Sequence, residues 1–287
     1  MGRPIDNPKT VSLSLRLAQN EANKLRACAD KLKTNRTTVI AKGIELVERE
    51  IKLDNMKIID SHAHIYPDRI AEKAARAISE FYGVPMAANG TLSSLFAAGD
   101  KAGIERFVVH SVATTPRQAI SINRFLAQTT AAYPERLTGL GALHPASETL
   151  VSDIEYIKNN GLKGVKIHPD FQRFNLDSPE AFALFEALEG VLPVLIHTGD
   201  SRTDFSSPKR LKRVLRAFPR LKVIAAHFGG WSVWQEAARV LGGMDLFVDT
   251  SSSLYALSVT EAEELVRAFT PERVLFGVDY PMWNHME

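Results

Sequence analysis

Eight short apolar segments, separated by polar or amphipathic chain, constrain the fold of this sequence more than any other feature. From Met56 onward the candidate strands are Ile58–His62, Phe107–Ser111, Leu137–Leu143, Gly164–His168, Pro193–His197, Val223–His227, Leu246–Asp249 and Val274–Asp279. Strands that alternate with helical segments form parallel βαβ units, and a count of eight predicts a closed (β/α)8 barrel. An open doubly wound sheet is the alternative, but no glycine-rich phosphate loop follows the first strand.

Histidines gather where these segments end. Seven of the eight histidines lie at or near the C-terminal end of a candidate strand: His62, His64, His110, His144, His168, His197 and His227. Barrel active sites are built at that same end from residues of several strands. Two residues apart in a strand, His62 and His64 of KIIDSHAHIY point to one face, so we expect them to form one wall of a polar site.

The later strand ends supply further groups with metal-binding chemistry. His197 ends LPVLIHTGD, His227 ends KVIAAHFGG and Asp279 ends VLFGVDYP. Three imidazoles with one carboxylate suit a divalent transition metal such as Zn²⁺ and leave one coordination position open for water.

Five sequence motifs give a more specific indication. IDSHAH, GVKIHPD, VLIHTGD, AAHFGG and FGVDYP occur in this order on five of the predicted strands. In these motifs, residues 56–287 resemble the amidohydrolase superfamily of TIM barrels. The nearest branch is the amidohydrolase-related one that contains aminocarboxymuconate semialdehyde decarboxylase-like proteins. The resemblance implies one divalent ion, Zn²⁺ or alternatively Mn²⁺, held by His62, His64, His197 and Asp279.

The resemblance also implies the catalytic groups. His227 is expected to act as the acid–base or polarising histidine beside the metal, and Asp279 to take a proton from the metal-bound water. We expect a hydrolase that activates water on the metal to cleave a small-molecule amide, ester or lactone. A metal-dependent decarboxylase (carboxy-lyase) of the same branch is the alternative.

For three other residues near these motifs, the sequence allows two roles each. His168 either contacts the substrate or lies behind the metal ligands, and Arg202 either clamps a substrate carboxylate or is a solvated loop charge. Lys166 is either a carboxylated bridge between two metals, as in binuclear relatives, or a lysine hydrogen-bonded inside the barrel, which we favour because this branch usually works with one metal.

Residues 1–53 form a separate unit in the sequence. TVSLSLRL alternates apolar and polar residues as a half-buried strand does, and two amphipathic helical patterns follow, with Asn35 as the expected N-cap of the second. One strand and two helices bury too little apolar surface alone, so a partner chain is expected.

This segment resembles the ribbon-helix-helix family of DNA-binding proteins, which dimerise by pairing one strand from each chain. The resemblance implies a homodimer in which Ser12, Ser14 and Arg16 face base edges in the major groove. Residues 1–55 carry 11 Lys/Arg and 7 Asp/Glu, a balance of +4 against +2 for the whole chain. A DNA-binding regulator whose barrel senses a small molecule therefore remains an alternative function.

Composition and chain ends complete these expectations. No apolar run approaches the roughly 20 residues of a membrane span, the N-terminus has no signal-peptide pattern, and Cys28 is the single cysteine. We therefore expect a cytoplasmic protein without membrane association. Only eight residues follow Asp279, so the barrel is expected to lack its last helix, with the outer face of its last strand uncovered.

Overall fold

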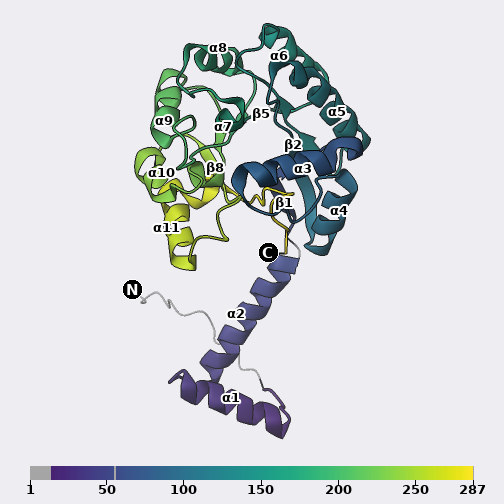
Figure 1. The fold of residues 1–287 in the computed structure, drawn as a ribbon. Coiled ribbons are helices and arrows are strands. Elements are labelled where there is room, and N and C mark those ends of the chain that lie inside the picture. The colour runs from purple at the N-terminus through teal and green to yellow at the C-terminus, as the bar shows by residue number, and fades with distance from the viewer. Residues whose placement is uncertain (1–13, 55, 287) are drawn as a thin grey trace, which may run out of the picture. The chain divides into compact units, whose positions relative to one another are not determined.

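The computed structural model describes residues 14–54 and 56–286 and divides the chain into two units, Met1–Met56 and Lys57–Glu287. In the first unit, helices α1 (Gln19–Lys31) and α2 (Arg36–Asp54) lie where the sequence predicts them (Figure 1). The prediction that Asn35 caps α2 is confirmed, because the Thr38 amide donates to Asn35 Oδ1 at 2.8 Å. Of the predicted strand, residues 11–13 lie outside the described residues, and residues 14–17 form no strand in the single chain.

The second unit is the predicted barrel. Its strands are β1 (Ile58–His64), β2 (Ile104–His110), β3 (Leu137–Gly139), β4 (Gly141–Ala142), β5 (Val165–Ile167), β6 (Val194–Ile196), β7 (Val223–Ala225), β8 (Phe247–Asp249) and β9 (Val274–Leu275). All neighbouring pairs are parallel, in chain order. β3 and β4 are two halves of one barrel strand, because Leu140 between them donates to Val109 O and Gly141 donates to Gly164 O.

The ring of strands closes between β1 and the residues that follow β9. Ser61 N donates to Phe276 O at 2.8 Å, Asp279 N to His62 O at 2.9 Å, and His64 N to Tyr280 O at 2.7 Å. Closure removes the sheet edges that would otherwise present unpaired backbone groups. It also brings Asp279, from the end of the chain, beside the two histidines of β1.

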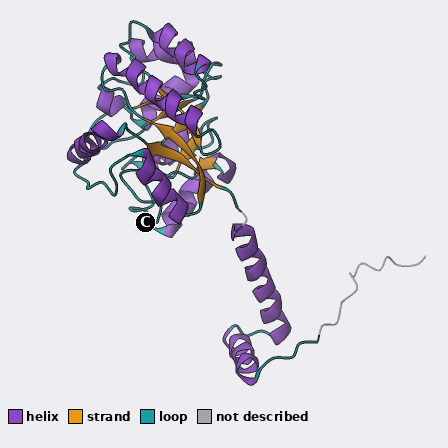
Figure 2. Cartoon of the chain, turned by 90° about the vertical axis from the view of Figure 1, so that its right-hand side faces the viewer, coloured by secondary structure: helices purple, strands orange, loops and turns teal. Residues whose placement is uncertain are grey.

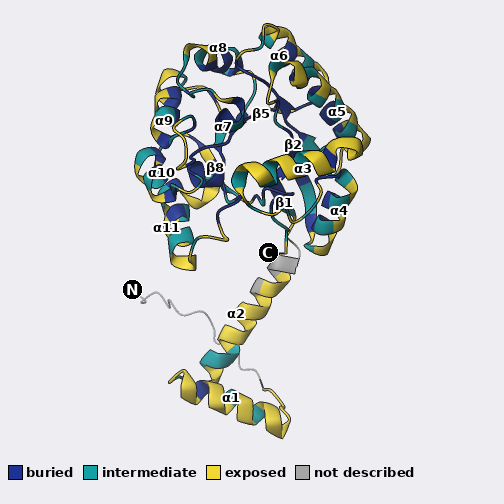
Figure 3. Ribbon diagram, in the orientation of Figure 1, coloured by how far each residue is buried: buried dark blue, intermediate teal, exposed yellow. Residues whose placement is uncertain are grey.

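Helices surround the strands of this unit, as Figure 2 shows. They are α3 (Asp68–Tyr82), α4 (Leu92–Lys101), α5 (Ala119–Ala132), α6 (Leu150–Asn159), α7 (Pro169–Gln172), α8 (Pro179–Leu188), α9 (Pro208–Ala217), α10 (Trp234–Leu241) and α11 (Val259–Phe269), with short 3₁₀ turns at Pro116–Gln118, His227–Gly229 and Pro271–Arg273. Most residues of the strands are buried, whereas the helices expose their outer faces (Figure 3). None of the helices in the described part of the chain has the length and apolar character needed to span a bilayer.

An irregularity in β1 determines which of its side chains face the barrel interior. Asp60 pairs with Phe107 and Ala63 with Val109, so β1 holds one residue more than β2 between these pairs. Phe107 packs against Phe96 of α4, on the outer side of the sheet, and Asp60 shares that side. The extra residue therefore lets Asp60 face outward while His62 and His64 face the site, which is the usual effect of a bulge beside an active site.

The chain after β9 packs beside β1. Residues 276–286 contain no helix. His285 instead folds back so that its Nε2 lies 2.9 Å from Asp60 Oδ2, with both side chains fully buried. Phe276 and Ile59 remain 40% and 49% exposed, so the outer face of this strand pair is only partly covered.

Candidate metal centre

A cavity at the C-terminal ends of the strands collects most of the polar side chains that the sequence indicates. Its polar lining consists of His62, His64, Lys166, His168, His197, His227 and Asp279. Its apolar lining consists of Ile78, Tyr82, Met86, Phe171, Pro281 and Met282. The free volume is about 20 Å³, which is room for about one water molecule.

The carboxylate of Asp279 lies between the two histidines of β1. Its Oδ1 is 3.3 Å from His62 Nε2 and 3.3 Å from His64 Nε2. Its Oδ2 accepts a hydrogen bond from Ser252 Oγ at 2.5 Å, and Ser252 is held in turn by Trp283 Nε1 at 2.8 Å. One oxygen of the carboxylate is thus fixed by the protein and the other faces two imidazole nitrogens.

Asp249, at the end of β8, holds His62 and the backbone of His227 in place through hydrogen bonds. Its Oδ2 accepts from His62 Nδ1 at 2.8 Å, and its Oδ1 accepts from the backbone of His227 at 2.9 Å and of Ser251 at 3.1 Å. A carboxylate can only accept, so His62 carries its proton on Nδ1 and presents the Nε2 lone pair to the cavity. This is the carboxylate–histidine arrangement that orients metal ligands.

The same reasoning fixes the protons of His227 and His197. His227 Nδ1 donates to the Ser251 carbonyl at 2.9 Å, so its Nε2 lone pair accepts from His197 Nδ1 at 2.9 Å. His197 Nε2 is then an unprotonated nitrogen, and it is buried without a hydrogen-bond partner among the described residues. A buried lone pair of this kind can bind a cation or accept a hydrogen bond from water.

Two residues of the site have strained backbones. His227 and Asp279 adopt φ values of 61° and 71°, in the left-handed region that side chains other than glycine rarely occupy. Each such residue costs on the order of 1–3 kcal/mol and persists only where the surroundings hold it. Here two hydrogen bonds hold these conformations, one from His227 N to Asp249 and one from Asp279 N to His62 O.

Burial sets the charges of the donors. It lowers the pKa of His62 to about 4, assisted by the nearby charge of Lys166, and it lowers the pKa of His64 and His197. Burial alone would raise the pKa of Asp279, but the neighbouring His62, His64 and His227 together outweigh it and hold the pKa below its ordinary value. The site therefore offers neutral imidazoles and an ionised carboxylate, the forms that bind a metal.

Lys166 and His168 stand on the β5 side of the cavity. Lys166 is fully buried with Nζ 3.3 Å from His62 Nε2, and burial lowers its pKa to about 8. His168 stacks on His197 at 3.8 Å between ring centres, and its Nε2 is 2.9 Å from the Tyr82 hydroxyl. His168 thus lies behind His197 and also meets the rim.

Arg202 is placed at the rim and not in the cavity lining. Its guanidinium pairs with both oxygens of Asp200, at 2.9 and 2.7 Å, and donates to Phe81 O at 2.8 Å. It also lies over the rings of Phe81 and Tyr82, at 4.8 and 5.0 Å. In this structure Arg202 therefore secures the end of α3; its binding of a substrate carboxylate stays a prediction.

The predicted ligands are thus near one another but not all in one tight group. His62, His227 and Asp279 offer ligand atoms within 4.8 Å of one another, and so do His62, His64 and His110. His197 instead groups with His168 and Asp170. In the N-terminal unit Ser14 and Arg16 are exposed, while Ser12 lies outside the described residues, so DNA binding also stays a prediction.

Comparison with known proteins decides the family. The family model described as amidohydrolase matches residues 59–286, most of the chain. The chain belongs to the amidohydrolase family. Its expected resemblance and barrel fold are confirmed, whereas the ribbon-helix-helix resemblance of residues 1–53 is not.

Solved structures similar to this amidohydrolase share its barrel. An uncharacterized TIM-barrel protein from Bordetella bronchiseptica is 22% identical, with a TM-score of 0.63 over 80% of this chain and 88% of that one. A 5-carboxyvanillate decarboxylase from Sphingomonas paucimobilis is 18% identical, with a TM-score of 0.60 over 78% and 89%. A dihydroxybenzoic acid decarboxylase from a Polaromonas species, solved with manganese and an inhibitor, is 16% identical, with a TM-score of 0.60 over 80% and 88%.

Several residues of the amidohydrolase site were not singled out by sequence reasoning. Asp249 ends the seventh barrel strand, so the strand-end rule that selected Asp279 would also have selected it. Ser251 and Tyr82 carry no comparable signal, because a serine in a polar loop and a tyrosine at a helix end are common. Only the closed barrel brings them to the histidines.

Replacing Asp249 tests whether this carboxylate fixes the proton position on His62, and it removes none of the side chains that line the cavity. In Asp249→Asn, the amide oxygen can serve the His227 and Ser251 amides while the amide nitrogen faces His62 Nδ1. His62 must then carry its proton on Nε2 and cannot bind a metal through it. We expect Mn²⁺ affinity, measured by calorimetry, to fall about 10–100-fold.

The matched control is Asp153→Asn on α6, a buried carboxylate outside the cavity that accepts from Ser147 and Thr149. It should bind Mn²⁺ as the unaltered protein does. Equal Mn²⁺ affinity in the Asp249 and Asp153 variants would contradict the proposed proton placement on His62.

Proposed function

We propose that the barrel is a metal-dependent decarboxylase that removes CO₂ from a small aromatic carboxylic acid. The observation that carries the proposal is the composition of the cavity: neutral imidazoles, one ionised carboxylate and a buried lysine, enclosed by an aromatic and apolar rim. The names of two similar solved structures, decarboxylases of aromatic acids, support this reaction class.

The donor set fits a divalent ion. His62 Nε2 and His197 Nε2 present lone pairs, Asp279 Oδ1 lies 3.3 Å from the Nε2 atoms of His62 and His64, and His197 Nε2 lacks another partner among the described residues. Mn²⁺ is our first choice, since a similar decarboxylase holds manganese, and Zn²⁺ suits the same donors. When bound, the ion would fix the oxygen atoms of the substrate and withdraw electron density from them.

The rim suits a flat, apolar substrate with a negative charge at one end. Tyr82 and Phe171 offer ring surfaces that lie 5.6 Å apart between centres, and Lys166 offers a cation at the base of the cavity. An aromatic acid is larger than the free volume of about 20 Å³, so Tyr82 and its neighbours must move aside for it to enter. Once enclosed, the carboxylate loses its water shell, which favours its conversion to neutral CO₂.

The reaction requires one proton at carbon. The bond between the carboxylate carbon and the ring carbon breaks, CO₂ leaves, and the electron pair stays on the ring carbon until a proton joins it. His227 faces the cavity from the end of β7 and is fixed by Ser251 and His197. Its Nε2 carries a lone pair in this structure, so we assign His227 the delivery of a proton that Nε2 first takes up from solvent, once the bond from His197 is released. Asp279, accessible from the same cavity, is the second group able to exchange a proton with the substrate.

Hydrolysis of an amide, ester or lactone is the second candidate. It is favoured by the position of Asp279, whose Oδ1 faces the Nε2 atoms of His62 and His64, where it can take a proton from water. It is also favoured by the room for about one water molecule in the closed cavity. Release of CO₂ from an aromatic acid distinguishes decarboxylation from hydrolysis.

Two histidine variants separate proton transfer from metal binding. A panel of hydroxybenzoic acids, with small amides and lactones in parallel, first identifies a substrate. His227→Asn should then keep its Mn²⁺ content nearly intact while turnover falls by about two to four orders of magnitude, the usual effect of removing a positioned acid or base. His197→Asn should lose metal and activity together, as elemental analysis and CO₂ release would record. Equal metal loss in the two variants would refute the role assigned to His227.

We further propose that the N-terminal unit pairs with a second copy of itself. Its helices leave large apolar side chains uncovered in the single chain, with Leu32, Ile44, Leu46 and Val47 between 52% and 61% exposed. Apolar surface of this extent in so small a unit favours a partner chain. The same pairing is required if Ser14 and Arg16 contact DNA.

Light scattering tests the pairing. The full chain should have at least the mass of a dimer, and deletion of residues 1–55 should lower it toward that of one barrel. The Leu46→Glu variant, in which a charge would enter the paired surface, should do the same in the full chain. A mass unchanged by both alterations would show that the N-terminal unit does not hold the copies together.

A further inference from the structure

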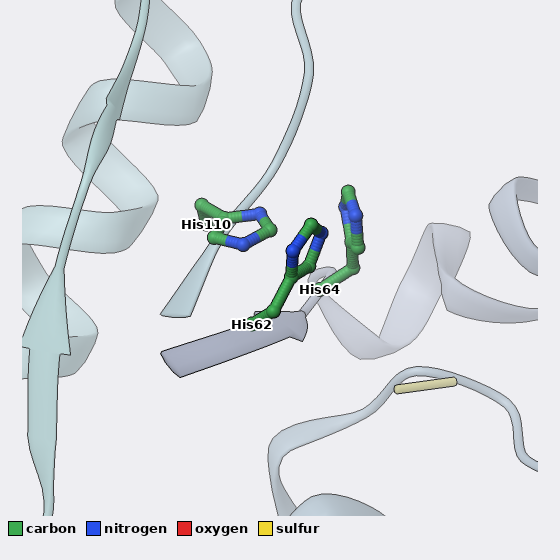
Figure 4. Close-up of side chains that lie close together, drawn as sticks. All are labelled: His62, His64 and His110. Carbon is green, nitrogen blue, oxygen red and sulfur yellow. The ribbon is translucent and has the colours of Figure 1, made fainter. Parts of the chain in front are cut away.

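His110 adjoins the cavity, and none of the sequence motifs gives it a role. It is the last residue of β2 and is the register partner of His64 in β1. Its ring lies edge-on to both histidines of β1, with centres 4.7 Å from His62 and 4.4 Å from His64 (Figure 4). Three imidazoles from two neighbouring strands thus converge on one space.

The ring of His110 is fully buried, yet neither of its nitrogens has a hydrogen-bond partner among the described residues. All eight histidines are described, and His110 alone has both nitrogens in this condition. His64 Nδ1, on the adjacent ring, is also buried without a partner. A buried polar atom without a partner destabilises the fold, so these adjacent rings indicate a ligand that binds at least one nitrogen of each.

A cation can bind the one nitrogen of each neutral ring that carries a lone pair. One ligand atom from each of His62, His64 and His110 lies within 4.8 Å of the others. Donors bound at about 2.0–2.1 Å to one ion are separated by up to about 4 Å, so small ring movements suffice to close them on it. Asp279 Oδ1, 3.3 Å from the Nε2 atoms of both β1 histidines, is near enough to join them.

We propose that His110 is a ligand of the divalent metal, bound together with the two histidines of β1. This inference rests on the proposed metal-dependent function and specifies which side of the barrel holds the ion. The ion then sits nearest β1 and β2, and His197, which keeps its Nδ1 bond to His227, can still bind it through Nε2. His110 of β2 is thus a metal ligand in addition to those that the sequence motifs indicate.

The test uses full-length protein, stripped of metal with a chelator and titrated with Mn²⁺ in a calorimeter. His110→Leu removes the imidazole and keeps the site filled. His110→Gln keeps a polar group with a hydrogen-bond acceptor but replaces the imidazole. The matched control is His144→Gln, at the end of the next strand, which does not line the cavity and accepts from the Ala146 amide.

If His110 is a ligand, both His110 variants lose more Mn²⁺ affinity than the about 10–100-fold caused by loss of an outer partner, and His144→Gln loses none. The visible spectrum of the Co²⁺-loaded protein should also change in band position and intensity in His110→Gln, because the coordination sphere changes. Thermal melting of the metal-free proteins verifies folding; if His110→Leu does not fold, the His110→Gln spectrum and affinity decide.

Two outcomes overturn the inference and leave the proposed function standing. Loss confined to His110→Leu, with His110→Gln like the unaltered protein, would make His110 a hydrogen-bonding neighbour of His64. Unaltered affinity in both would reduce it to packing. If the unaltered protein itself fails to bind Mn²⁺, Zn²⁺ or Co²⁺, the proposed function falls together with this inference.

Discussion

The buried carboxylate of Asp249 is the interaction on which the rest of the site depends. It accepts from His62 of β1, from the backbone of His227 after β7, and from Ser251, and so joins three segments that are far apart in the chain. Burial alone would raise the pKa of Asp249, but His62 and its other partners outweigh that effect and keep it ionised. An unpaired charge at this depth would cost several kcal/mol, so the surrounding donors must stay in place.

This constraint extends to the backbone and to the neighbouring strands. The strained turn at His227 is held by its bond to Asp249, and the strained turn at Asp279 is held by the closure of the barrel against β1. The bulge in β1 sends Asp60 outward to His285 and leaves His62 and His64 facing inward. The candidate metal-binding and catalytic groups are therefore positioned by the way in which the ring of strands closes.

Much of this arrangement can be predicted from the sequence because it depends on local pattern. The strand-end rule locates five of the seven strand-end histidines and Asp279 around one cavity. The period of two places His62 and His64 on one face, and the Asn35 cap marks the start of α2. These features require only backbone geometry and the polarity of neighbouring residues.

The remaining features depend on contacts between distant segments, which a single sequence does not display. Arg202 carries the charge expected of a residue that binds a substrate carboxylate, but its guanidinium donates to the buried Asp200 two residues earlier. His110 follows the same strand-end rule as the other histidines, but only the folded chain shows that its ring nitrogens have no hydrogen-bond partner among the described residues. Tyr82 reaches His168 because α3 ends over the cavity.

The most direct test of a metal centre in this barrel is an anomalous difference map from crystals of the Mn²⁺-loaded protein, measured on both sides of the manganese absorption edge. We expect one strong peak at the C-terminal ends of the strands, about 2.0–2.2 Å from imidazole nitrogens of His62 and His64 and from Asp279 Oδ1. A map with no peak there, or with manganese bound only at surface carboxylates, would contradict the account.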